Sequence, residues 1–106
     1  MDAWSLDELD ARRVAAGKLY EEFLRVPALS AGLYVLEAGA TDPQSPHDQD
    51  EVYVVMAGRG VIRVAGEDSE VGPGSAVYVA AGVEHRFHSI AERLQLMVVF
   101  APCQAS

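Results

Sequence analysis

The feature that most constrains this chain is a succession of short β-prone runs separated by turn-forming residues. From residue 18 onward, β-branched and aromatic residues gather in short runs, and glycine, proline or small residues separate them. The expected strands are residues 18–26, 29–37, 51–56, 61–65, 75–79, 84–88 and 94–100. Among the breaks, 58–60 is expected to be a hairpin turn, with further breaks at 66–68 and 91–92. Connections this short exclude the helical crossovers of a parallel sheet, so the pattern predicts an all-β antiparallel sandwich or barrel.

A short helix is expected before the strands. Ser5 and Glu8 have the spacing of a capping box, in which each side chain satisfies a free backbone amide of the other residue. Gly17 is a natural stop signal, so the helix is predicted over residues 6–16. We therefore expect a helical lead-in over residues 1–17 and a single barrel over residues 18–106.

Charge and composition exclude several classes of partner. The net charge of −8 argues against nucleic acid and anionic membrane surfaces, which are bound mainly through lysine and arginine. The amino terminus lacks the apolar core of a secretory signal, and no apolar run approaches the roughly 20 residues of a membrane helix. The single cysteine, Cys103, cannot form an internal disulfide and fits a reducing compartment. The sequence thus predicts a soluble, cytoplasmic protein.

Three residues with metal-binding side chains stand near the ends of predicted strands. His47 lies four residues before Glu51, and His85 follows a later strand and turn. A carboxylate at the start of an apolar strand is costly inside a barrel unless it is paired or binds a metal. In an extended strand, four residues span about 13 Å, too far for one ion about 2 Å from each ligand atom. A shared site therefore requires the chain to curl between His47 and Glu51, and the aspartates between them suit such a turn.

The same segment has a helical alternative. Ser45 could serve as the N-cap of a helix and Pro46 as its first residue. His47 and Glu51 would then share one face of that helix. The β-branched and aromatic residues of Val52–Val55 favour a strand instead.

The order of these residues resembles the two sequence motifs of the cupins. His47, Glu51 and Gly58 match the second half of the first motif, and residues 74–85 match the second. The resemblance covers roughly residues 30–100. Cupins are small antiparallel β-barrels of the jelly-roll type, and they usually hold a transition metal inside the barrel on three histidines and a glutamate. The resemblance therefore implies a jelly-roll barrel, preceded here by a short helix.

By position, the resemblance implies that His47, Glu51 and His85 are the metal ligands. The first histidine of the family's motif is replaced by Ser45, which leaves an open position or weakens metal binding. Two histidines and one carboxylate are the ligand set of non-haem iron oxygenases, and zinc, nickel and manganese also accept these ligands. One divalent iron, manganese, nickel or zinc ion is therefore expected. Gln44 is the candidate fourth ligand, and a water could equally fill the position.

The alternation of side chains along a strand indicates which residues line the pocket. Tyr53 shares a strand face with Glu51, and Phe87 shares one with His85, so both are predicted to line the pocket. The same alternation turns His88 outward, away from the implied site.

The resemblance implies a metal-dependent enzyme acting on a small organic molecule, with oxygenase, isomerase and lyase chemistry all open. One alternative is a non-catalytic cupin that binds or senses a small ligand or a metal. Another is a metal-free enzyme in which His85 and a tyrosine form the acid–base couple. The resemblance also implies a homodimer.

Overall fold

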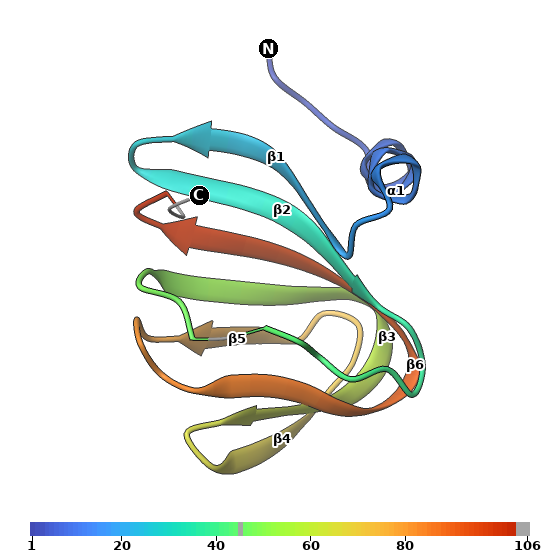
Figure 1. Cartoon of the computed structure of the whole chain (residues 1–106), viewed down its shortest axis with the longest axis vertical. Coiled ribbons are helices and arrows are strands. Elements are labelled where there is room, and N and C mark those ends of the chain that lie inside the picture. The colour runs from blue at the N-terminus through green and yellow to red at the C-terminus, as the bar shows by residue number, and fades with distance from the viewer. Residues whose placement is uncertain (45, 104–106) are drawn as a thin grey trace.

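One helix and six strands make up the computed structural model, which describes residues 1–44 and 46–103 (Figure 1). In chain order the elements are α1 (Leu6–Ala16), β1 (Tyr20–Val26), β2 (Leu29–Leu36), β3 (Asp50–Val64), β4 (Glu67–Val71), β5 (Ala76–Val79) and β6 (His85–Ala101). Helix α1 begins where Ser5 accepts a hydrogen bond from the Glu8 backbone amide and ends at the left-handed Gly17. The predicted helix is confirmed, and within the described residues no helix is long and apolar enough to cross a membrane.

All strand pairs are antiparallel, in the order β1-β2-β6-β3-β4, with β5 pairing separately with β3. The two longest strands, β3 and β6, pair with each other along most of their length and bend together (Figure 1). Their register shifts three times between Val55 and Val61, and such bulges bend a sheet and increase its twist. The curvature closes the sheet over its own inner face, and the predicted antiparallel jelly-roll barrel is confirmed.

Two predicted breaks are wrong, because β3 runs through residues 58–60 and β6 runs through residues 91–92. The glycines of 58–60 serve the bulged bend of β3 instead of a hairpin turn. Gly58 has φ of 92°, and a Cβ atom there would overlap the backbone carbonyl of Arg93 on β6. Strand β4, which starts inside the expected break at 66–68, was missed because its acidic, largely exposed residues lack strand-like alternation.

Apolar side chains form two separate clusters on the two faces of the sheet. The larger cluster fills the barrel and includes the fully buried Tyr53, Phe87 and Leu94. The smaller cluster lies between the outer face of β2 and helix α1, where Leu9 packs with Leu33. Helix α1 therefore covers the outside of the sheet and leaves the interior of the barrel to the functional site.

Candidate metal centre

A bend in the chain brings His47 towards Glu51. The residues after His47 are not extended: the chain bends at Asp48 and Gln49, and β3 starts only at Asp50. The His47 carbonyl accepts a 2.7 Å hydrogen bond from the Gly82 amide, which fastens this loop to the turn before β6. The predicted curl is confirmed, and the helical alternative is wrong for residues 46–51, the part of that segment which the structure describes.

The ligand atoms of His47, Glu51 and His85 all lie within 4.8 Å of one another. His85 Nε2 is 2.7 Å from Glu51 Oε1, and each of these two side chains is 1% exposed. His47 is half-buried, with its ring centroid 5.9 Å from that of His85 and 4.8 Å from that of Phe100, in a T-shaped contact with the latter. The loop before β3 and the start of β3 thus bring His47 and Glu51 to His85 at the start of β6, which lies more than 30 residues further along the chain.

The imidazole of His85 is oriented by the backbone. Its Nδ1 is 2.9 Å from the carbonyl oxygen of Val83, which can only accept, so Nδ1 carries the proton of this hydrogen bond. Nε2 is therefore the atom turned towards Glu51. Burial alone would lower the pKa of His85, but hydrogen bonds to Glu51 and Val83 and the charge of Glu51 outweigh it, so this pKa lies above its usual value.

The second carboxylate oxygen of Glu51, Oε2, is buried without a hydrogen-bond partner. A buried, unpaired carboxylate oxygen is costly, and a bound cation would remove that cost. Two imidazoles and a carboxylate are also a common donor set for divalent transition metals. The residues present therefore fit a metal ion. Ser45, at the position expected to be open, lies outside the described residues.

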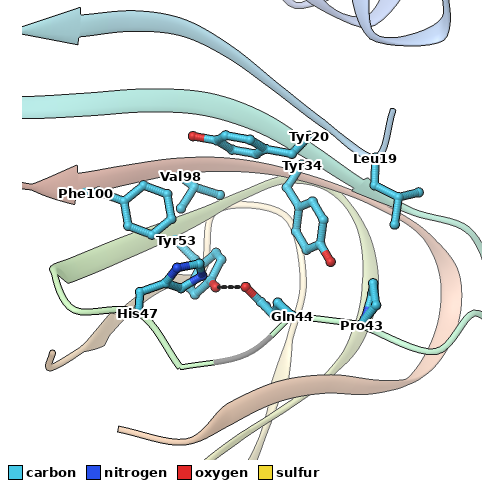
Figure 2. Close-up of a pocket in the computed structure, with 9 residues that line it drawn as sticks. All are labelled: Leu19, Tyr20, Tyr34, Pro43, Gln44, His47, Tyr53, Val98 and Phe100. Carbon is cyan, nitrogen blue, oxygen red and sulfur yellow. Dashed lines mark hydrogen bonds between the residues drawn. The ribbon is translucent and has the colours of Figure 1, made fainter. Parts of the chain in front are cut away.

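A cavity of about 270 Å³ adjoins the cluster and has mainly aromatic walls (Figure 2). Its lining residues are Leu19, Tyr20, Tyr34, Pro43, Gln44, His47, Tyr53, Val98 and Phe100. Tyr53 is one of these lining residues and Phe87 is not. Phe87 is fully buried, and its ring lies nearly perpendicular to that of Tyr53 with the two centroids 5.0 Å apart. His47 is the one ionisable group besides the tyrosines among these lining residues.

The hydroxyl of Tyr53 links the cavity to the cluster. It lies 2.8 Å from Gln44 Oε1 and 3.0 Å from His85 Nε2. Burial raises the pKa of Tyr53, and the charge of Glu51 raises it further, so the phenol stays protonated. Gln44, the predicted fourth ligand, uses its carbonyl oxygen to accept from Tyr53 and its amide nitrogen to donate to Asp42.

Asp42 is a buried residue of this region that the sequence did not single out. Asp42 is 1% exposed, and its carboxylate accepts hydrogen bonds from the Tyr34 hydroxyl and the Phe87 amide. An aspartate before a proline in a glycine-containing loop is typical of an exposed turn. The pattern therefore gave no sign that this one is buried.

His88 lies outside the cluster. It is on the outer face of β6, where its Nε2 is 3.0 Å from Asp68 Oδ1. The same aspartate forms an ion pair with Arg63, at 2.8 Å between Nε and Oδ1. His88 is therefore a member of a surface charge cluster, on the side that strand alternation predicted.

The chain folds into an antiparallel jelly-roll barrel, and two histidines and a glutamate lie together inside it. These features place it among small barrel proteins with a candidate metal site. The family model described as "Cupin domain" matches residues 32–100. The chain belongs to the cupin family, as the resemblance of its two motifs predicted.

Relatives cover nearly the whole chain. An uncharacterised protein of Streptomyces coelicolor is 54% identical over 102 residues, spanning 96% of this chain and 97% of that protein. The crystal structure of TT1209 from Thermus thermophilus superposes with a TM-score of 0.77 at 28% identity, covering 97% of this chain and 99% of that one.

A lyase is also among the structural neighbours. The crystal structure of DMSP lyase DddQ from Ruegeria pomeroyi DSS-3 has a TM-score of 0.67 at 23% identity. The match covers 72% of this chain and 39% of that one. At this level of identity the similarity concerns the fold alone.

Proposed function

We propose that this cupin is a metal-dependent enzyme that acts on a small organic molecule at a divalent ion held by His47, Glu51 and His85. The observation that carries the proposal is the gathering of three ligand atoms within 4.8 Å beside a cavity of about 270 Å³. Two of the three ligands are almost fully buried, so an ion there would be shielded from bulk water. The ion is iron, manganese, nickel or zinc, because each accepts imidazole and carboxylate ligands.

When bound, the ion would act as a Lewis acid that polarises an oxygen atom of the substrate. His85 presents Nε2 because Val83 holds its other ring nitrogen, and Glu51 supplies a negative charge to neutralise the ion. The mainly aromatic walls of the cavity favour a small, mainly apolar substrate. The Tyr53 hydroxyl is close enough to the His85 ligand atom to hydrogen-bond a molecule bound there.

The proposal is tested by the metal content of untagged protein purified without metal-affinity resin. Elemental analysis should find about one divalent ion per chain, and His47→Ala and His85→Ala should lose it. His88→Ala is the matched control, because His88 lies on the outer face against Asp68 and should leave the metal content unchanged. Equal metal retention in all three variants would contradict the proposed site.

The reaction class needs a second experiment, because the fold does not specify it. The fold neighbours include a DMSP lyase, so elimination reactions are one class to assay on metal-loaded protein. Oxygen uptake by iron-loaded protein tests the oxygenase class. Tight binding of a small molecule without turnover in any assay would favour the non-catalytic, ligand-sensing alternative.

A metal-free acid–base enzyme is a second candidate, favoured by the 3.0 Å contact between Tyr53 and His85. In that case, protein treated with a chelator would keep full activity. Activity that disappears with the metal and returns when the metal is restored would exclude this candidate.

A further inference from the structure

Asp42 is the centre of a buried hydrogen-bond network next to the candidate metal centre. Its Oδ1 accepts from the Tyr34 hydroxyl at 2.6 Å and from the Gln44 backbone amide at 3.2 Å. Its Oδ2 accepts from the Gln44 side-chain amide at 2.7 Å and from the Phe87 backbone amide at 3.0 Å. Because each oxygen accepts from a backbone N–H, which can only donate, the carboxylate acts as an acceptor throughout.

This carboxylate determines how the side-chain amide of Gln44 is turned. The amide has a donating nitrogen and an accepting oxygen, and its two orientations differ in which of them faces Asp42. Placing the oxygen against Asp42 would set two acceptors 2.7 Å apart, so the nitrogen must face the carboxylate. Gln44 Oε1 is then turned towards Tyr53, 2.8 Å from its hydroxyl (Figure 2).

The orientation of Gln44 in turn fixes the direction of the Tyr53 hydroxyl. Gln44 Oε1 can only accept a hydrogen bond, so the Tyr53 hydroxyl donates its one proton to this oxygen. The lone pairs of the Tyr53 oxygen then remain for the side that faces His85 Nε2, 3.0 Å away. Once Nε2 binds an ion it carries no proton, and a bound molecule becomes the available donor to Tyr53.

We propose that Asp42 is a positioning residue that, through Gln44, makes Tyr53 a hydrogen-bond acceptor for a hydroxyl or other protic group of the molecule bound at the metal. This inference rests on the proposed metal-dependent function and narrows its substrate class. The preferred substrate is small, has a mainly apolar body, and carries an O–H or N–H donor next to the atom that contacts the ion. In this proposal the oxygen of Gln44 acts on Tyr53 instead of serving as a fourth ligand.

The test compares two small probes on cobalt(II)-loaded protein, whose visible absorption reports binding at the ion. Glycolate carries a hydroxyl donor, whereas methoxyacetate has the same carboxylate and no donor. We expect the wild-type protein to prefer glycolate by about fivefold, the value of one hydrogen bond. Tyr53→Phe and Asp42→Asn should both abolish the preference. Tyr34→Phe removes another donor from the same carboxylate and should keep the ratio, even if both affinities shift together.

A second measurement needs neither metal nor ligand. Hydrogen exchange of the Gln44 side-chain amide, followed by NMR on metal-free protein, should be slowed by Asp42 about tenfold or more relative to an exposed glutamine. Asp42→Asn should remove this protection, whereas Tyr34→Phe should preserve it. If Asp42 only anchors the loop to Phe87, the Gln44 amide will exchange rapidly in the wild-type protein as well, and the proposal is overturned.

The remaining outcomes also decide the question. If Asp42→Asn does not fold, Gln44→Met is the second variant. It removes the hydrogen bond to Tyr53 and leaves the contacts of Asp42 with Tyr34 and Phe87 in place, and it should abolish the glycolate preference. A preference that survives Tyr53→Phe would overturn the acceptor role of Tyr53. If cobalt(II) does not bind, the metal site itself fails, and the amide-exchange experiment alone then decides the role of Asp42.

Discussion

Replacing Glu51 with glutamine should stabilise the metal-free protein while weakening its metal binding. Glu51 Oε2 is buried without a partner, and Oε1 is paired with His85 Nε2 at 2.7 Å. In Glu51→Gln the negative charge of residue 51 is removed. The positive charge of His85 is removed with it, because His85 Nε2 can lose its proton and accept a hydrogen bond from the new amide. Replacing a buried ion pair with apolar residues of similar volume is often neutral or stabilising by roughly 1–4 kcal/mol, and Glu51→Gln likewise leaves no charge unpaired once His85 is neutral.

From these terms we expect the free energy of unfolding of the metal-free variant to rise by about 1–2 kcal/mol. The unpartnered carboxylate oxygen costs roughly 1–3 kcal/mol in the wild-type protein. In the variant the same place holds part of a neutral amide, which is less costly to leave unpaired than a charged oxygen. Part of this gain is lost, because the charged hydrogen bond between the two side chains becomes a neutral and weaker one. A gain of 1 kcal/mol corresponds to a shift in Tm of roughly 4–8 °C for a domain of this size.

The assay is urea unfolding in the presence of EDTA, with thermal unfolding as a second measurement. Glu84→Gln is the matched control, because this exposed side chain loses the same charge and should change stability by less than about 0.5 kcal/mol. In parallel, the affinity of Glu51→Gln for zinc should fall by more than the roughly 10–100-fold typical of residues that only support a ligand. A variant less stable than the wild-type protein in EDTA would refute the reasoning.

Three further predictions concern the core, the surface charges and the assembly. Phe87→Ala removes a fully buried ring that packs on Tyr53 and should cost about 3–5 kcal/mol in urea unfolding. The pKa of Asp68 is lowered to about 2, first by Arg63 and then by His88, so this carboxylate favours folding above pH 3.8 and loses that effect as the pH falls through 2. Carbon-13 NMR should find the lowered midpoint, and Arg63→Gln should move it back towards 3.8. Sedimentation should detect a homodimer, and a pure monomer at micromolar concentration would contradict that expectation.

The fold could be predicted from the sequence because its strands and turns are marked locally. The main errors fall where β3 and β6 bend, since a glycine that permits a bulge looks the same in sequence as a glycine that ends a strand. Gly58 has a positive φ, and the carbonyl of Arg93 on β6 leaves no room for a side chain there. That contact is between residues far apart in the chain, so no local sequence pattern predicts it.

The proximity of His47, Glu51 and His85 could also be predicted, because the resemblance to the two cupin motifs implied a shared site. Reach along a strand then required the bend that the structure has. The network around Asp42 could not. Two of its donors, Tyr34 and Phe87, lie 8 and 45 residues away, and one is a backbone amide that every residue type except proline possesses.

Strand alternation placed Tyr53 on the inner face, but the face of a side chain does not give the direction of its hydrogen bonds. That direction follows from a chain of donors and acceptors that starts at a carboxylate outside the strands. Because Asp42 only accepts, Gln44 must present its oxygen, and the proton of Tyr53 is taken up before any ligand arrives. The candidate ligand atoms at this site come from residues that the motifs mark. In our proposal, the selectivity of the cavity for a hydrogen-bond donor follows from Asp42, a loop residue that the motifs do not mark.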